Sequence, residues 1–154
     1  MESDAENPAS ELRLQDTIRL SAEGVAKVLG DLEARVVHAV WALDAPAAAR
    51  TVYEKVIVDH PVAIHTVITV LNKLVTKGLL CRKKIDDVFH YRACYSEAEF
   101  RQEMSRRAIE GILSLGPQAV AASFVDVLAE RDPEQLAPLM RLIRKRMDEE
   151  KEDG

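Results

Sequence analysis

A stretch near the middle of the chain carries side chains that could contact DNA. Residues 63–78 read AIHTVITVLNKLVTKG, and one side of the expected helix holds hydroxyls, an amide, an imidazole and an ammonium group but no acid. Such short hydrogen-bonding side chains suit a surface that lies against base edges and phosphates, whereas a solvated helix more often mixes Glu with Lys. We therefore interpret this stretch as a DNA-recognition helix. Its polar side chains are His65, Thr66, Thr69, Asn72, Lys73 and Thr76.

The other side of the same stretch indicates how the polar face would be oriented. Four apolar residues recur at positions i, i+3, i+4 and i+7, which form the apolar stripe of one helix face. They are Val67, Val70, Leu71 and Leu74. Gly78 follows at the position where a left-handed residue ends a helix.

After Gly78 the sequence alternates as a strand does. Residues 79–84 (LLCRKK) and 88–93 (VFHYRA) flank a turn at 85–87, which predicts a β-hairpin. An ordinary exposed hairpin is the alternative interpretation, since basic residues also protect sheet edges. The cations that could bind phosphate on this hairpin are Arg82, Lys83, Lys84 and Arg92.

Charge is distributed unevenly along the chain. The formal net charge of −5 argues, by itself, against a nucleic-acid ligand. Residues 63–95 nevertheless hold 6 Lys and Arg against 2 Asp and Glu, whereas 1–62 hold 6 against 11 and 96–154 hold 9 against 13. Because a phosphate backbone responds to the local field, a basic centre between acidic flanks indicates a DNA-binding segment.

Two further helices are expected before the recognition helix. Residues 32–43 have a helical apolar pattern, with Asp31 as N-cap and Trp41 as a core residue. A second helix runs from 48 to 58 and ends at 59–61, where proline disfavours helix. Three helices followed by a basic hairpin form the order of a winged helix-turn-helix domain.

The C-terminal third predicts amphipathic helices that need a partner. Residues 96–99 form a capping-box sequence, and breaks at 116–117 and 132–133 separate three helices. These make too thin a layer to bury their apolar faces alone, so a second copy of the chain is expected to cover them. The acidic residues 149–154 are expected to be a solvated tail. The expected dimerisation residues are Phe100, Met104, Ile112, Val120, Phe124, Leu128, Leu136, Leu139, Met140 and Ile143.

Two cysteines lie on the two expected strands of the hairpin. With a turn centred on residues 86–87, Cys81 and Cys94 are diagonal neighbours with Cα atoms roughly 7–8 Å apart, at or beyond the usual disulfide limit. A one-residue shift would put them on opposite faces. In the first register His90 shares their face, so a redox or metal switch at these three residues is an alternative to two unpaired thiols in a reducing cytoplasm.

Other classes of protein are disfavoured. The sequence has no Gly-rich phosphate loop, HExxH, GxSxG or CxxC motif, so no enzymatic activity and no cofactor is expected. No apolar run approaches the ~18 residues that a membrane span requires. The acidic, polar N-terminus does not resemble a secretory signal, and a cytoplasmic protein is expected.

The order of these elements resembles the penicillinase-repressor family, the BlaI/MecI/CopY group of bacterial regulators. The resemblance covers roughly residues 29–146. Its most specific segments are LGDLEARVVHAVW, TVITVLNKLVTKGLL, FHYRACYSEAEF and AVAASFVDVLAERDPEQLAPLMRLI.

The resemblance implies a homodimeric repressor whose winged helix enters the major groove. The family's DNA-contacting positions correspond here to His65, Thr66, Ile68, Thr69 and Lys73, and Ile68 could pack against a thymine methyl. A membrane sensor protease is a regulatory partner of some members, but those carry Asn-Phe where this chain has Arg107-Ala108. Copper-responsive members carry a C-terminal cysteine cluster, and this chain has no cysteine after Cys94.

The sequence thus predicts a mainly α protein with a small β-hairpin. Residues 1–28 are an N-terminal extension, either a loose tail or an arm, 29–95 a winged-helix DNA-binding domain, and 96–148 a helical dimerisation region. The expected function is sequence-specific repression by a homodimer on a pseudo-palindromic operator in double-stranded DNA. The alternatives are a winged-helix protein-interaction module without DNA binding and a repressor switched through Cys81 and Cys94.

Overall fold

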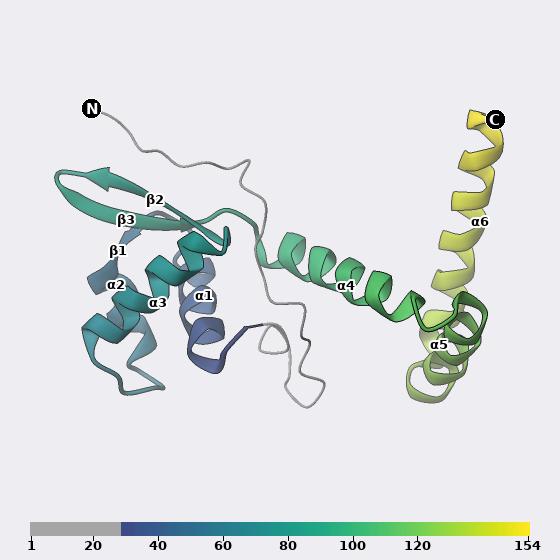
Figure 1. Ribbon diagram of the computed structural model, residues 1–154, viewed down its shortest axis with the longest axis horizontal. Helices are drawn as coiled ribbons and strands as arrows, with labels where there is room; N and C mark the ends of the chain where they lie inside the picture. Colours follow the sequence, from purple (N-terminus) through teal and green to yellow (C-terminus); the bar gives the residue numbers. More distant parts are fainter. Residues whose placement is uncertain (1–28) are drawn as a thin grey trace. The chain divides into compact units, whose positions relative to one another are not determined.

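The computed structural model describes residues 29–154 (Figure 1), so the predicted N-terminal extension lies outside the described residues. The chain forms two compact units, divided between Ser105 and Arg106. The first unit is a mainly helical domain with a small sheet, and the second is entirely helical in its regular structure.

Three helices of the first unit match the expected order. They are α1 (Asp31–Leu43), α2 (Ala49–Val56) and α3 (Ile64–Thr76). The predicted N-cap of α1 is wrong, because Gly30 occupies that position and Asp31 is the first helical residue. There Asp31 and Glu33 still lie in the first turn, where the helix dipole favours acids.

Helix α3 ends as its glycine predicts. Gly78 has φ 85°, a conformation that a residue without a Cβ adopts at little cost. Its N–H donates to the Val75 carbonyl at 3.0 Å, and the Leu79 N–H donates to the Leu74 carbonyl at 3.0 Å. This pair of bonds is a Schellman motif, and it turns the chain directly into the first strand of the hairpin.

The hairpin consists of β2 (Leu80–Ile85) and β3 (Val88–Ala93), which pair antiparallel. Asp86 and Asp87 have φ 52° and 64° and form a two-residue turn of the type that matches strand twist. A short strand, β1 (Ala47–Ala48), pairs with β3 opposite Tyr91 and His90. The sequence predicted no strand there, because two alanines carry no strand periodicity, and Ala48 was expected to begin the second helix.

The core of the first unit lies where α1, α2, α3 and the base of the sheet meet. All four residues of the α3 stripe are buried, which confirms the helical pattern read from the sequence. Trp41 packs against this core as predicted, and its Nε1 donates to the Tyr95 carbonyl at 2.8 Å.

The helix α4 (Glu97–Leu113) opens with the predicted capping box. The Ser96 hydroxyl accepts from the Glu99 N–H at 3.1 Å, and the Glu99 carboxylate accepts from the Ser96 N–H at 2.9 Å. Phe100, 1% exposed, packs 5.8 Å from the Trp41 ring, and Met104 also contacts this core. Phe100 is therefore covered within the first unit and is not free for a dimer contact, whereas Met104 is only partly buried and its assignment to a dimer contact stays a prediction.

The second unit comprises the end of α4, α5 (Pro117–Arg131), the 3₁₀ turn η2 (Pro133–Gln135) and α6 (Leu136–Asp153). Gly116 with φ 128° and Pro117 separate the first two helices, at the predicted break. The last helix continues through Asp153, so residues 149–153, expected to be a tail, are helical. No residue of α5 or α6 is buried in this chain alone.

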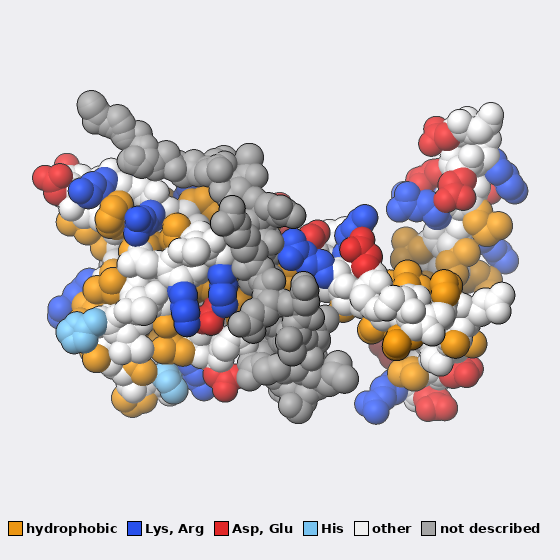
Figure 2. All heavy atoms as spheres, viewed as in Figure 1, with side chains coloured by type: hydrophobic (Ala, Val, Ile, Leu, Met, Phe, Trp, Pro, Cys, Tyr) orange, Lys and Arg blue, Asp and Glu red, His pale blue; other side chains and the backbone are white. Residues whose placement is uncertain are grey.

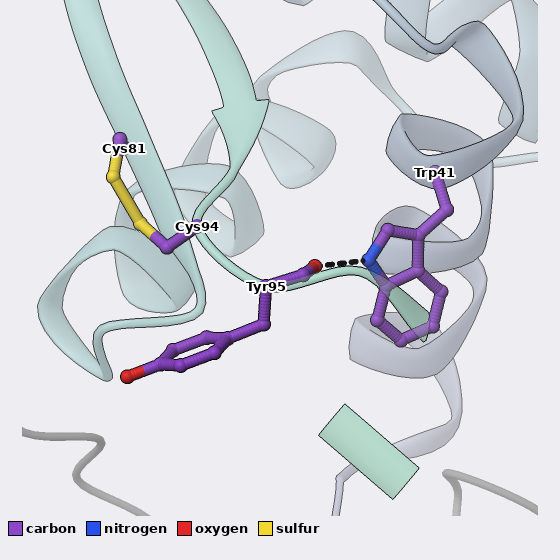
Figure 3. Close-up of a disulfide and its surroundings, with 4 residues drawn as sticks. All are labelled: Trp41, Cys81, Cys94 and Tyr95. Carbon is purple, nitrogen blue, oxygen red and sulfur yellow. Dashed lines mark hydrogen bonds between the residues drawn. A yellow bond between two sulfur atoms is a disulfide. The ribbon is translucent and has the colours of Figure 1, made fainter. Parts of the chain in front are cut away.

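Cys81 and Cys94 form a disulfide at the base of the hairpin (Figure 3). The predicted register is confirmed, with Cys81 opposite Arg92, but the Cα atoms are 5.7 Å apart rather than 7–8 Å. Strand twist brings one diagonal pair of a two-stranded ribbon closer than a flat sheet would, which the sequence estimate ignored. The expectation of two unpaired thiols is therefore wrong.

Removal of this cross-link should destabilise the protein. The double variant Cys81→Ser/Cys94→Ser is expected to lose about 3 kcal/mol of unfolding free energy, the chain-entropy value for a loop of this length. Thermal unfolding with and without dithiothreitol measures the effect. The double variant is its own control, because reductant should leave its midpoint unchanged; a wild-type midpoint equally insensitive to reductant would contradict the prediction.

Candidate nucleic-acid interface

The polar face predicted on α3 is open to solvent. His65, Thr66, Thr69 and Lys73 are exposed, and Ile68 is half-buried among them. The apolar stripe on the opposite side is buried, which holds these side chains outward. The structure thus brings together on one helix face all five residues that the family resemblance assigned to DNA contact.

Two threonines of α3 use their hydroxyl protons within the helix. The Thr69 hydroxyl donates to the His65 carbonyl at 2.9 Å, and the Thr76 hydroxyl donates to the Asn72 carbonyl at 3.1 Å. Each oxygen keeps lone pairs that can accept a further bond. Thr69 in this rotamer therefore offers an acceptor and a methyl group, which suits a base edge better than a phosphate.

The cations of the hairpin do not all have the same surroundings. Lys83, Lys84 and Arg92 are exposed, as expected for phosphate ligands. Arg82 is half-buried instead: its Nη1 donates to the Asn72 side-chain oxygen at 2.7 Å, and its guanidinium lies 4.3 Å from the centre of the Phe89 ring. Arg82 was predicted to contact DNA directly, but at least one of its five N–H donors is used within the domain.

Asn72 is the site residue whose role the sequence did not indicate. Its side-chain oxygen accepts from Arg82 and also from the Tyr91 hydroxyl at 2.9 Å. The three residues come from α3, β2 and β3, 10 and 19 positions apart from Asn72 along the chain. No local spacing links them, so only the strand register and the helix placement together could have revealed this contact.

Lys77 contributes less to the interface than its place in the basic segment suggested. Its ammonium group pairs with the Glu33 carboxylate of α1, and both side chains are mostly buried. The two acids of the hairpin, Asp86 and Asp87, are exposed at its tip. The exposed cations of these elements are therefore Lys73 on the helix and Lys83, Lys84 and Arg92 on the hairpin.

A metal switch at Cys81, His90 and Cys94 is contradicted by the structure. Both sulfur atoms are bonded to each other and are not available as thiolate ligands. The Nδ1 atom of His90 lies 3.0 Å from the Val88 carbonyl oxygen. Among residues 29–154, no group of three His, Cys, Asp or Glu side chains is placed to hold a metal ion.

The second unit has a different kind of surface. An open apolar groove of about 420 Å³ lies between the end of α4 and α5. Figure 2 shows hydrophobic side chains gathered over α5 and the adjoining part of α6. The groove is lined by Ile109, Ile112, Leu115, Ala119, Val120, Ser123, Phe124 and Val127.

Comparison with known proteins gives one family. The sequence profile of the family described as penicillinase repressor matches residues 29–145, which cover a large part of each unit. A search of curated proteins found no match. In the described part of the chain, no helix is long and apolar enough to cross a membrane.

Proposed function

The chain belongs to the penicillinase-repressor family, and from this premise we propose that it represses transcription as a homodimer bound to a pseudo-palindromic DNA operator. The observation that carries the proposal is the exposed, acid-free face of α3 beside the exposed cations of the hairpin. The hairpin, residues 80–93, is called the wing below.

The recognition helix supplies groups of complementary kinds. Thr69 offers an acceptor for a base amino group, and Ile68 offers an apolar surface for a thymine methyl. His65 and Thr66 lie at the exposed N-terminal end of α3, where helix residues of this motif meet base edges. Lys73, further along the helix, is suited to a phosphate.

The wing supplies positive charge. Lys83, Lys84 and Arg92 are exposed and can each neutralise a phosphate without reading sequence. Each such contact releases counterions from DNA, so the affinity should fall steeply with salt even though the whole chain is acidic. The local field at the interface, and not the net charge of −5, determines this response.

The second unit supports the homodimer. Helices gain most of their stability from packing an apolar face, yet α5 and α6 bury no residue within the chain. Phe124, Met140 and Ile143 are about half-exposed. A second copy of the chain carries the same apolar surface, so the two surfaces can cover each other in a two-fold symmetric interface. The residues proposed for it are Ile112, Val120, Phe124, Leu128, Leu136, Leu139, Met140 and Ile143.

The phosphate contact of Lys73 can be tested by its salt dependence. Lys73→Ala is expected to weaken binding to all duplexes by a similar factor, and to lower the slope of log K against log salt by about two, one for each protomer of the dimer. Fluorescence anisotropy with a labelled duplex, repeated across salt concentrations, measures both effects.

The matched control is Lys151→Ala, which removes the same charge from the exposed end of α6. This variant should leave the slope unchanged. Equal slopes for wild type and Lys73→Ala would place Lys73 outside the interface. Wild-type protein that binds no duplex even at low salt would refute DNA binding and leave the protein-interaction module.

Thr69 is expected to affect sequence preference rather than general affinity. Thr69→Ala removes the acceptor and should relax preference at one base position per half-site, with a cost of about 1–3 kcal/mol on the preferred base. Thr69→Ser keeps the acceptor and serves as the control. Competition with single-base variants of the bound duplex measures the preference; the same ranking of duplexes for wild type and Thr69→Ala would contradict the prediction.

The homodimer can be tested at the apolar groove. Phe124→Glu is expected to raise the dimer dissociation constant at least about 30-fold, because burial of an unpaired carboxylate costs roughly 2 kcal/mol or more. Gln118→Glu adds the same charge to α5 outside the groove lining and should stay dimeric. Sedimentation equilibrium distinguishes them, and a Phe124→Glu protein as dimeric as the control would refute this interface.

A further inference from the structure

Asn72 joins the recognition helix to both strands of the wing. Its side-chain oxygen accepts from Arg82 of β2 at 2.7 Å and from Tyr91 of β3 at 2.9 Å. Arg82 and Tyr91 are directly opposite each other in the register, so both donors reach Asn72 from the same face of the sheet. The amide group of Asn72 thus connects α3 to both strands at one pair of opposed residues, Arg82 and Tyr91.

The two donors are themselves held in place. Tyr91 is 2% exposed, and its strand pairs on its other edge with Ala47 of β1. The Arg82 guanidinium lies over the Phe89 ring, which fixes its plane in addition to the hydrogen bond. Because a buried tyrosine hydroxyl needs a partner, loss of the Asn72 oxygen would leave a polar group unsatisfied beside α3.

The wing has other contacts besides this one, and β3 also pairs with β1 at Tyr91 and His90. Its base is fixed by the disulfide and by Leu79 and Leu80 in the core. Toward the tip, Ile85, Val88 and Phe89 are exposed. The hydrogen bonds to Asn72 lie between these two regions and join the wing to α3.

We propose that Asn72 is a positioning residue that holds the wing at a fixed angle to the recognition helix, so that wing cations reach the same duplex as α3. The inference rests on the proposed DNA binding. In this role Arg82 acts through Asn72 and is not itself a phosphate ligand. A wing that is already oriented loses less conformational freedom when it binds, so its charge contributes more to affinity.

An alternative is that Asn72 reads a base, since asparagine amides pair well with adenine. The free protein already uses its oxygen for two intramolecular bonds, which a bidentate base contact would have to break. The two roles differ in outcome. A base-reading Asn72 would change sequence preference, whereas a positioning Asn72 changes how much the wing cations contribute.

The test is a double-mutant cycle between Asn72 and Lys83, measured by anisotropy with a labelled duplex across salt concentrations. In wild type, Lys83→Ala should weaken binding about fivefold at low salt and lower the slope of log K against log salt by about two, one for each protomer of the dimer. In an Asn72→Ala background, Lys83→Ala should have less than half of each effect, because the wing no longer holds Lys83 against phosphate.

Two variants keep the test specific. Asn72→Asp retains an oxygen acceptor for both donors and should restore the Lys83 coupling, although its charge lowers affinity overall. Thr76→Ala removes a hydrogen bond on the same helix without touching the wing and should leave the coupling intact. Amide hydrogen exchange without DNA should show faster exchange at residues 82–91 in Asn72→Ala but not in Thr76→Ala.

The outcomes separate this inference from the proposed function. Duplex binding with equal Lys83 effects in both backgrounds, unchanged exchange in the wing, or a changed base preference in Asn72→Ala would overturn the positioning role alone. Failure of the wild-type protein to bind any duplex would refute the proposed function and the inference together.

Discussion

The burial of one stripe of α3 is the constraint on which the rest of the site depends. Val67, Leu71 and Leu74 have no exposed surface, and they pack in the core with α1, α2 and the base of the sheet. Because one side of the helix is fixed in this way, the opposite side has a single direction in which to point. The Schellman motif at Gly78 then starts β2 at a defined place beside α3. The polar face of α3 and the wing therefore form one surface. A local sequence pattern predicts the polar face, but it does not predict that the wing lies beside it.

The features predicted correctly from the sequence are those that repeat locally. The stripe of α3, the capping box at Ser96 and the β-hairpin around residues 85–87 each follow from spacing within one element. Three of the features that were missed are contacts between elements: Asn72 with the wing, Lys77 with Glu33, and Phe100 with the core of the first unit. Periodicity marks Phe100 as apolar, but it does not tell which apolar surface will cover it. The disulfide was not predicted because the expected Cα–Cα distance between Cys81 and Cys94 assumed a flat sheet. Strand twist shortens one of the two diagonal distances between paired strands.

The two units present two different kinds of surface. The first offers short polar groups and cations, whose contribution depends on local charge and salt. The second offers exposed apolar side chains, whose burial does not depend on salt in the same way. An acidic chain can therefore bind DNA, because its cations gather in residues 63–95, which hold 6 Lys and Arg against 2 Asp and Glu. The homodimer would add a second recognition helix and so double the number of base positions read.

The central claim is that two copies of α3 read one duplex. Selection of bound sequences from a random double-stranded library by the full-length protein tests it most directly. The account predicts an enriched site with two copies of a half-site in inverted orientation, with centres roughly 10 base pairs or a multiple apart. Libraries that stay random, or that enrich a single half-site without a repeat, would contradict it.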